Sequence, residues 1–349
     1  SEVTWEKVRK QNYGIDLKMF GARLSLTADY FFEHRYDILS TRNTLPSIVA
    51  IELPLINLGE VDNRGYEISL GWNSRAEKID WWVQGNVSYS KNKIIFMDEV
   101  MPNYPWMAQT GRSTGLNYGY RFDRFLRADD FDADGALKTD GEGKPLLPVM
   151  SLGSPRPGDA LFKDLNGDGK IDGNDKTYFG YSQRPDYVLG LLGGFRYKNF
   201  EISMQWTAGL HASRMLSGEY RNAFGSTNGR ALLKFLADGR WTPENPDARF
   251  PRLTFLNKSH YLEDSDLWLM DGSYLRLKVA EIGYTFRDIP AFRKVGVKSL
   301  KVYFSGYNLL TLFSELNDID IDPEGATSGS NIDSYPNVRI FNFGVNITF

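Results

Sequence analysis

Side chains that could bind a metal ion are concentrated in one stretch, DLNGDGKIDGND, at residues 164–175. Its spacing matches the template of a calcium-binding loop, with Gly169 at the sharp turn. The expected oxygen donors are Asp164, Asn166, Asp168, Lys170 through its carbonyl, Asp172 through a water molecule, and Asp175. Asp175 stands where such loops have Glu, which shortens the reach and weakens the affinity or admits a smaller ion. The spacing therefore predicts structural calcium or magnesium, and the alternative is an Asx-rich turn without an ion.

A second acidic run, DDFDADG at 129–135, begins with the same spacing at Asp130, Asp132 and Asp134. Gly141 occupies the position at which a closing carboxylate would be needed. This run is therefore predicted to be a solvated acidic loop.

Catalytic signatures are weak. The three histidines, His34, His211 and His260, lie far apart in the sequence, which contains no G-x-S-x-G elbow, H-E-x-x-H helix or phosphate-binding loop. Cysteine is absent, which excludes disulfides, zinc–thiolate centres and thiol catalysis. Carboxylates are abundant, but without geometry no glycosidase pair can be assigned among them. We therefore expect that the protein is not an enzyme.

The composition of the chain argues against some classes of binding partner. The 41 Lys and Arg residues against 44 Asp and Glu give a net charge of -3, which argues against nucleic acid as a partner. Aromatic residues make up 14% of the 349 residues, although the mean hydropathy is only -0.40. No run approaches the roughly 20 apolar residues of a spanning helix, and the first residues do not resemble a signal peptide. If the protein is exported, its beginning is expected to be missing from this chain.

The elements that would position these loops are predicted from alternating apolar and polar residues. The alternating segments are 13–19, 24–32, 66–72, 79–89, 187–197, 200–208, 275–286 and 341–349, while 298–311 is less regular. Within 275–286 the apolar phase slips, as a bulge near Ala280 or Glu281 would cause. The links are either very short (Gly21, 74–78, 198–199 and 287–297) or very long (33–63, 92–184, 211–271 and 312–337).

Two folds produce such a pattern, a soluble β-sandwich and a transmembrane β-barrel. Several segments alternate for about 10 residues, the length that a tilted strand needs to cross a bilayer, whereas sandwich strands average about 5 to 6. Aromatic residues such as Trp72, Trp81 and Trp206 lie on the apolar parity, as in the interface girdles of barrels. We therefore predict an all-β chain that forms roughly 10–12 strands of a transmembrane antiparallel β-barrel with long extracellular loops.

The topology has one open point. If the carboxy-terminus is periplasmic, all short links are periplasmic and all long links extracellular, provided that 92–184 crosses the membrane an even number of times. Residues 115–122 are predicted to form a strand, and 159–165 a weaker one. Either this pair crosses the membrane, or both segments stay outside as a hairpin in the loop.

Several phrases resemble the carboxy-terminal half of SusC/RagA-like TonB-dependent outer-membrane transporters. They are NLGEVDNRGYEISL (57–70), RPGD followed by DLNGDGKIDGND (156–175), RWTPENP (240–246), DGSYLRLKVAEIGYTF (271–286), YFSGYNLLT (303–311) and YPNVRIFNFGVNITF (335–349). The resemblance spans nearly the whole chain, in order. It implies a plugged barrel of about 22 strands in the outer membrane of a Gram-negative bacterium. Residues 1–349 would be its carboxy-terminal part, and the plug, TonB box and regulatory domain would precede them.

The same resemblance implies active import of oligosaccharides or oligopeptides, powered by TonB through the amino-terminal part, with a SusD-like surface lipoprotein as partner and membrane lipid around the barrel. Loop aromatics that would contact substrate or partner, or else pack the loops, are Tyr104, Trp106, Tyr220, Phe224 and Trp241. Residues 229–241 are predicted to form a short amphipathic helix that docks the lipoprotein or packs on the rim. Its apolar side would hold Leu232, Leu233, Phe235 and Leu236.

Two other functions are compatible with the same residues. One is a soluble calcium-dependent glycan-binding β module, and the other is an outer-membrane β-barrel enzyme. Dependence on detergent separates the first from a transporter, because exposed lipid-facing tryptophans would aggregate in water. Catalysis in the absence of any partner would favour the second.

Overall fold

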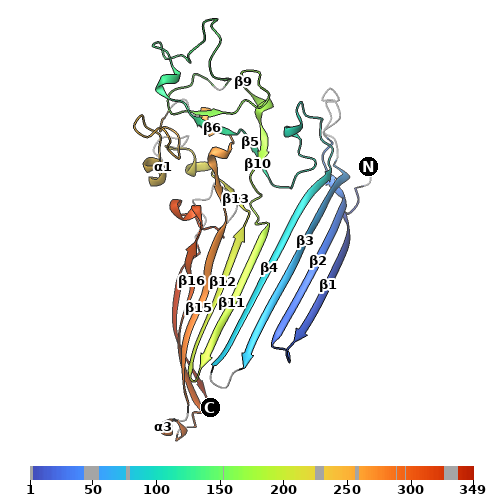
Figure 1. Cartoon of the computed structure of the whole chain (residues 1–349), viewed down its shortest axis with the longest axis vertical. Helices are drawn as coiled ribbons and strands as arrows, with labels where there is room; N and C mark the ends of the chain where they lie inside the picture. The colour runs from blue at the N-terminus through green and yellow to red at the C-terminus, as the bar shows by residue number, and fades with distance from the viewer. Residues whose placement is uncertain are drawn as a thin grey trace.

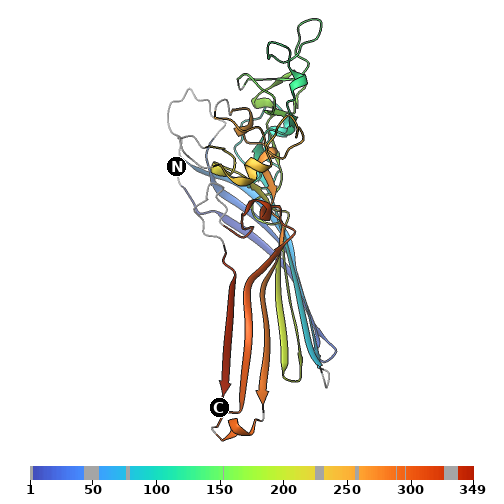
Figure 2. The same ribbon diagram turned by 90° about the vertical axis from the view of Figure 1, so that its left-hand side faces the viewer.

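One large antiparallel sheet dominates the computed structural model, which describes residues 3–42, 55–75, 79–151, 153–224, 232–255, 259–287, 289–294, 296–325 and 337–349. Within these residues nine strands follow one another across the sheet in chain order. They are β1 (Lys7–Met19), β2 (Leu24–Ser40), β3 (Ile56–Arg75), β4 (Ile79–Phe96), β11 (Tyr187–Tyr197), β12 (Phe200–Leu210), β15 (Tyr274–Arg287), β16 (Ser299–Leu312) and β17 (Ile340–Thr348). Figures 1 and 2 show tilted strands in a curved, open wall.

The two ends of the wall differ, as the sequence predicted. Residues 20–23 and 198–199 make tight links at one end, here called the turn end, and Gly21 adopts a positive φ of 66° there. The described part of the link between β15 and β16 at this end contains the short helix α3 (Pro290–Arg293). The long segments gather at the other end, the loop end, and the carboxy-terminus lies at the turn end (Figure 1).

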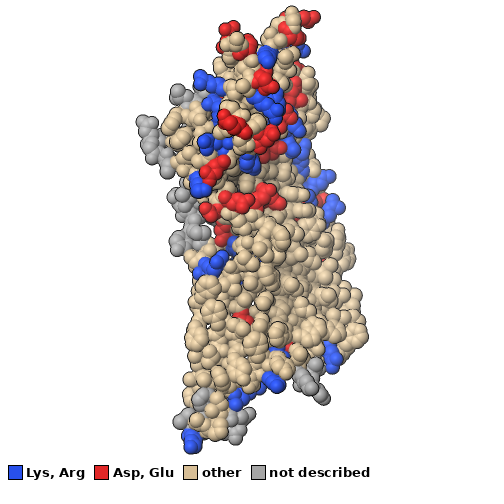
Figure 3. Space-filling view, turned by 60° about the vertical axis from the view of Figure 1, so that its left-hand side comes forward, with Lys and Arg blue, Asp and Glu red and all other residues tan. Residues whose placement is uncertain are grey.

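The two faces of the wall also differ, because successive side chains of a strand point to opposite sides. A row of tyrosines crosses neighbouring strands on the apolar face, with each residue directly opposite the next; its members are Tyr13, Tyr30, Tyr66, Tyr89 and Tyr187. Toward the turn end, the ring of Trp72 lies next to those of Phe20 and Trp81 on the same face. Aliphatic side chains fill the belt between these aromatic rows, and Figure 3 shows it as a surface with few charges below the charged loops.

The bulge in β15 lies slightly earlier than predicted. The pairing with β12 passes from Trp206 opposite Leu277 to Gln205 opposite Val279, so Lys278 is the extra residue. Val279 consequently lies on the polar face rather than with Leu277 on the apolar face. Lys278, the extra residue of the bulge, forms an ion pair with Glu324. In a strand without the bulge, the side chain of Lys278 would be placed differently.

Residues 115–122 and 159–165 stay within the loops. There β5 (Asn117–Gly119) pairs with β10 (Thr177–Phe179), and β6 (Phe122–Phe125) pairs with β8 (Ala160–Phe162). The described sheet has nine strands, below the predicted ten to twelve, because this pair remains at the loop end. The other short loop elements are β7 (Val149–Met150), β9 (Lys170–Ile171), β13 (Ser213–Met215), β14 (Leu269–Asp271), α1 (Lys234–Asp238) and α2 (Ser259–Leu262). No helix in the described part of the chain is long and apolar enough to span a membrane.

The main hydrophobic core lies in the loops and not in the wall. Its buried members come from four stretches that are distant in sequence: Tyr120, Phe125, Met150, Ala160, Phe162 and Ile171; Leu216, Ala223, Leu236, Trp241 and Phe250; Tyr261, Leu267, Trp268 and Met270; Leu316 and Ile319. Trp268 and Leu236 are almost fully buried within it. The described residues of the segments 97–186, 211–273 and 313–325 therefore fold together, and we call this assembly the loop module.

The orientation of the wall predicts a contrast between two neighbouring positions of β3. Leu70 lies exposed on the apolar face between the tyrosine row and Trp72, whereas Ser69 faces the polar side and accepts a hydrogen bond from Gln84. Leu70→Arg should destabilise the folded protein in lipid by about 2–4 kcal/mol, because it buries a charge in hydrocarbon. Ser69→Arg should cost much less. Equal losses in refolding titrations into lipid vesicles would contradict this assignment of the faces.

Candidate functional site

The predicted metal loop is closed by hydrogen bonds to its own backbone. The two carboxylate oxygens of Asp164 accept from the backbone N–H groups of Gly167 (2.6 Å) and Gly169 (2.8 Å). Asp168 accepts from Lys170 N–H (2.8 Å) in the same manner. These are Asx-type turns, and they hold the loop in a compact form.

Asp175, the predicted closing ligand, is fully buried. Its oxygens accept from the backbone N–H groups of Leu165 and Asp172, each at 2.8 Å. Burial raises the pKa of Asp175, and the nearby charge of Asp164 adds to this effect, whereas the backbone hydrogen bonds oppose it. No group of three or more acidic or histidine side chains among the described residues is arranged to hold a metal. Metal binding by this loop therefore stays a prediction.

Two of the predicted contact aromatics lie directly on this loop. The rings of Tyr104 and Trp106 stack with centroids 4.5 Å apart and an angle of 9° between their planes. Trp106 Nε1 donates to the carbonyl of Asn174 (2.9 Å), and the amide of Asn166 donates to the Tyr104 hydroxyl (3.3 Å). Both rings are half-buried. The pair thus attaches the chain after β4 to the acidic loop and keeps part of its surface exposed.

The other predicted contact aromatics pack the loop module. Trp241 is buried in its core, Tyr220 stacks on Phe235 with centroids 6.1 Å apart, and Phe224 stacks on Phe255 at 4.1 Å. The helix predicted over 229–241 is shorter, since α1 begins at Lys234 and residues 225–231 lie outside the described part. Its apolar residues, Leu232, Leu233, Phe235 and Leu236, all contact the loop core.

The RPGD phrase forms a largely buried charged contact of the loop module. The Asp159 carboxylate is fully buried and lies 2.7 Å from Nε of Arg252. It also accepts from the backbone N–H of Arg156 (2.8 Å). Gly158 has a φ of 87°, and a Cβ there would come within 2.5 Å of the Trp241 ring. This turn therefore requires glycine, and it joins the 156–159 segment to the 241–252 segment.

A cavity of about 800 Å³ opens in the loop module between α1 and the short helix η7 (Glu315–Ile319). Its lining combines rings with charged groups: Tyr220, Phe235 and Phe250 with Lys234, Asp238, Arg249, Glu315, Asp318 and Asp320. Arg249 donates to the carbonyl of Leu267 (2.6 Å), and burial lowers its pKa. The carboxylate of Asp318 is exposed and has no ion pair within the described residues. Rings beside open carboxylates can bind sugar hydroxyls or the donors of a peptide.

A network of charges fastens the segment after η7 to the polar face of the wall. Arg276 of β15 is buried, and its guanidinium donates to Asp322 and to Glu324, both at 2.8 Å. Lys278, the bulge residue, reaches the same Glu324 carboxylate. Arg214 of β13 donates to the carbonyl of Pro323 (2.9 Å). The network therefore joins three segments of the loop end at one point.

Sequence reasoning did not identify the members of these two charged contacts. The RPGD phrase was visible as a motif, but its partner Arg252 lies 93 residues away. Arg276 and Lys278 stood out as polar residues in an alternating strand, while Asp322 and Glu324 lie 46 residues further along. Ion pairs between residues so far apart leave no periodic pattern in the sequence, so the sequence alone does not predict them.

Comparison with known proteins gives a consistent result. The family model described as "TonB dependent receptor-like, beta-barrel" matches residues 2–309. TonB-dependent receptor P3 of Formosa agariphila is 30% identical, with 99% of this chain and 34% of that protein aligned. TonB-dependent receptor SusC of Bacteroides thetaiotaomicron is 23% identical over 99% of this chain and 32% of its own length.

Among solved structures, that of the RagAB peptide importer in its 'open-open' state superposes with a TM-score of 0.70. The sequence identity is 19%, and the match covers all of this chain and 35% of that chain. The similarity therefore concerns the fold. The chain spans about a third of the length of the relatives it matches.

Loss of one charge should destabilise the protein more at the ion pair of Asp159 and Arg252 than at an exposed ion pair of the loop module. Asp159→Asn should destabilise the loop module by about 3 kcal/mol, the lower end of the cost of breaking a buried ion pair, because the largely buried Arg252 (side chain 16% exposed) loses its counter-charge. Asp247→Asn is the matched control, since Asp247 is 84% exposed in its pair with Arg127 and should contribute only about 0–1 kcal/mol. Hydrogen exchange of the loop amides measures both, and equal protection in the two variants would contradict the role of the buried pair.

Proposed function

Since the chain belongs to the TonB dependent receptor-like β-barrel family and is an outer-membrane protein, we propose that it serves active import of oligosaccharides or oligopeptides. One observation carries this proposal: the long loops fold into a module with its own core and a cavity, at the loop end of a wall with one polar face. A polar face suits the lumen of a barrel through which solutes pass. The energy would come from TonB, acting on parts of the transporter outside these residues.

The cavity between α1 and η7 is the proposed contact for substrate. Its volume of about 800 Å³ is in the range of ligand pockets. The exposed Asp318 supplies an acceptor at its edge, and Tyr220 with Phe235 supplies ring surface. Such a lining suits an extended polar oligomer better than a compact apolar molecule. Tyr104 and Trp106 on the acidic loop offer a second, smaller ring surface.

A SusD-like surface lipoprotein is the proposed partner at the loop end. Large apolar side chains are exposed there, among them Phe255 at 73% and Phe313 at 84%. Exposed apolar groups surrounded by polar residues are typical of protein contacts. Phe255 also stacks on Phe224, so a partner that covers it would contact the loop core directly.

The two competing functions fit the structure less well. A soluble glycan-binding module would need to cover the aliphatic belt, but Leu70, Leu191, Phe343 and Ile347 are among many belt residues exposed on the apolar face. An enzyme would need a nucleophile or an acid–base pair in a cleft. The carboxylates that line the cavity between α1 and η7 are exposed to solvent, and none of them is held in a cleft as such a pair would be. In addition, the relatives compared above are named as receptors.

Uptake assays test the transport proposal. Cells lacking the gene should lose uptake of labelled oligosaccharides or of labelled oligopeptides, and loss of TonB should have the same effect. Asp318→Asn should lower uptake at low substrate concentration about tenfold, the effect of losing a hydrogen bond to a charged group. Asp134→Asn, in the second acidic run, should leave uptake unchanged. Unchanged uptake in cells without the gene, together with cleavage of the oligomer by the purified protein, would favour the enzyme.

We also propose that the 164–175 loop binds calcium in a structural role. Four carboxylates lie in this loop, and the extracellular side offers calcium concentrations at which even a weak loop of this type is occupied. To bind the ion, Asp164, Asp168 and Asp175 would each have to give up a hydrogen bond from a backbone N–H group, so that one carboxylate oxygen could face the ion. A bound ion would compensate the burial of Asp175 and strengthen the contact with Trp106.

Chelation tests this role without any transport measurement. Addition of calcium should slow hydrogen exchange of the 164–175 amides, and chelator should reverse the effect. Asp168→Ala should abolish the response, while Asp134→Ala is the control in the run that lacks a closing carboxylate. Exchange that is the same with calcium and with chelator would show that the loop is held by its backbone hydrogen bonds alone.

A further inference from the structure

Cationic side chains stand just beyond the tyrosine row on the apolar face. Arg64 lies directly opposite Lys91 in the register of β3 and β4, and each is two residues from a tyrosine of the row. They therefore point to the same face as Tyr66 and Tyr89. Lys93 follows on that face toward the loop end. All three cations are exposed, at the level where a barrel wall leaves the hydrocarbon and meets the headgroups.

These cations border a notch of about 580 Å³ between the top of β4 and the start of β11. Its far side is formed by residues 111–113 and 180–182, and Tyr89 lies at its lower edge. Lys91 is 3.3 Å from Asp186, the one carboxylate among the described lining residues. Arg112 also borders the notch, but its guanidinium donates to the carbonyls of Ala108 and Trp106.

Two of the cations have no counter-charge of their own. Arg64 and Lys93 make no ion pair or side-chain hydrogen bond within the described part of the chain. The carboxylate opposite Lys93 in the register is Asp62, which is held by His34 at 2.7 Å. The notch therefore has an excess of positive charge, and an anion with several oxygen acceptors would fit it.

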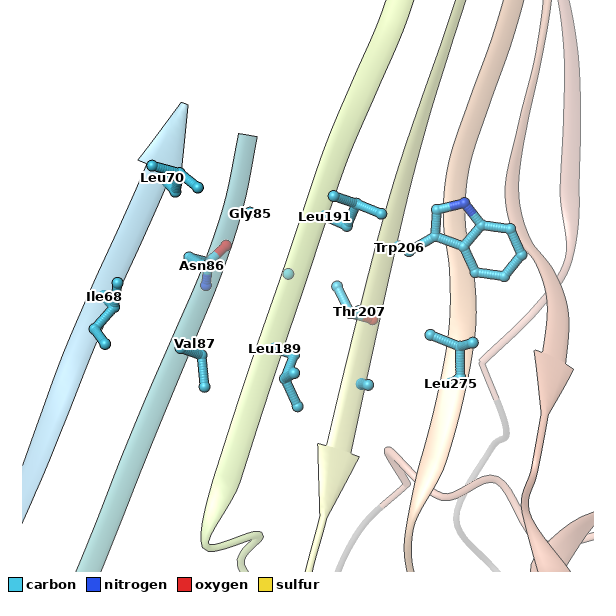
Figure 4. A pocket seen from close by; sticks show the side chains of 12 residues that line it. Ile68, Leu70, Gly85, Asn86, Val87, Leu189, Leu191, Trp206, Thr207 and Leu275 are labelled. Atoms are coloured by element: carbon cyan, nitrogen blue, oxygen red, sulfur yellow. The ribbon is translucent and has the colours of Figure 1, made fainter. Parts of the chain in front are cut away.

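An apolar groove of about 620 Å³ lies on the same face, next to the notch on the side of the turn end. It crosses β3, β4, β11, β12 and β15, and Figure 4 shows its side chains. Gly85 lies opposite both Leu70 and Leu191 in the register, and its missing side chain leaves the gap between them. Ile68 and Val87 continue the lining toward the notch. Ile68 follows Arg64 by four positions of β3, a distance of about 13 Å along the strand.

We propose that the notch and the groove together bind one phosphorylated lipid of the outer leaflet. The phosphate lies between Arg64, Lys91 and Lys93, and an acyl chain lies along the groove at Gly85. The tyrosine row marks the depth at which the headgroup ends and the chain begins. The occupant follows from charge and position: cations at the headgroup level need an anion, and a groove facing hydrocarbon takes an acyl chain. This assignment is independent of the imported substrate.

Native mass spectrometry of the full-length transporter from micelles tests the site, with dioleoyl phosphatidic acid and dioleoyl phosphatidylcholine as competing probes. The wild type should retain phosphatidic acid in preference to phosphatidylcholine. The double variant Arg64→Gln/Lys93→Gln should weaken retention about thirtyfold, because each cation near an anionic lipid contributes a factor of about five. The control Lys138→Gln/Lys144→Gln removes two exposed charges from the loop module and should leave retention unchanged.

The groove is tested by Gly85→Leu, which fills the gap. A Cβ at Gly85 meets Leu191 only at 3.9 Å, so the backbone at this position accepts a side chain. This variant should also lose phosphatidic acid, whereas millimolar inorganic phosphate should not displace the lipid from the wild type. Equal retention of the two lipids by the wild type, or full retention by Arg64→Gln/Lys93→Gln, would overturn the site. Displacement by inorganic phosphate, or unchanged binding in Gly85→Leu, would show a free-anion site and overturn the lipid assignment.

Discussion

A lipid bilayer offers no hydrogen-bond partner to a peptide group, and this constraint determines the rest of the structure. An extended chain satisfies it only when each strand pairs along its whole membrane segment with its neighbours. The seven strands between β1 and β17 meet this requirement by pairing with a neighbour on each side, while β1 and β17 pair on one side within the described residues. Pairing then leaves only the side chains to distinguish lipid from lumen, and their alternation along each strand gives the wall one apolar and one polar face.

A consequence is that the wall needs no hydrophobic core of its own. Its apolar residues contact lipid, so burial by protein has to stabilise other parts of the molecule, and the described core lies in the loop module. Loops normally carry few buried apolar residues. Here Trp268, Tyr261 and Phe162 are almost fully buried, and they hold the segments between β4 and β15 in one arrangement. The cavity between α1 and η7 thus lies among segments that the loop core itself packs together.

The difference between the wall and the loop module explains which features of the structure the sequence could predict. Strand positions, faces and short links follow from alternation and turn residues, which are local. The structure confirms them apart from the position of the bulge and the length of β2 and β3, which reach Ser40 and Ile56 within the link predicted over 33–63. The loop module depends on contacts such as Trp241 with Gly158 and Asp159 with Arg252, between residues far apart in the chain. Tyr104 and Trp241 are both aromatic residues of long loops, and the sequence does not distinguish their surroundings. In the structure Tyr104 lies half-buried on the acidic loop, whereas Trp241 is buried in the core of the loop module.

The position of the bulge shows how the wall and the loop module are coupled. Lys278 is the extra residue of β15, and with Arg276 it binds Glu324 of the segment after η7. Arg276 is buried, so its charge needs these carboxylates, and they in turn hold that segment against the polar face. Glu315, Asp318, Ile319 and Asp320, which precede it in the chain, line the cavity beside α1. These ion pairs therefore join a strand of the wall to the part of the loop module that forms one side of the cavity.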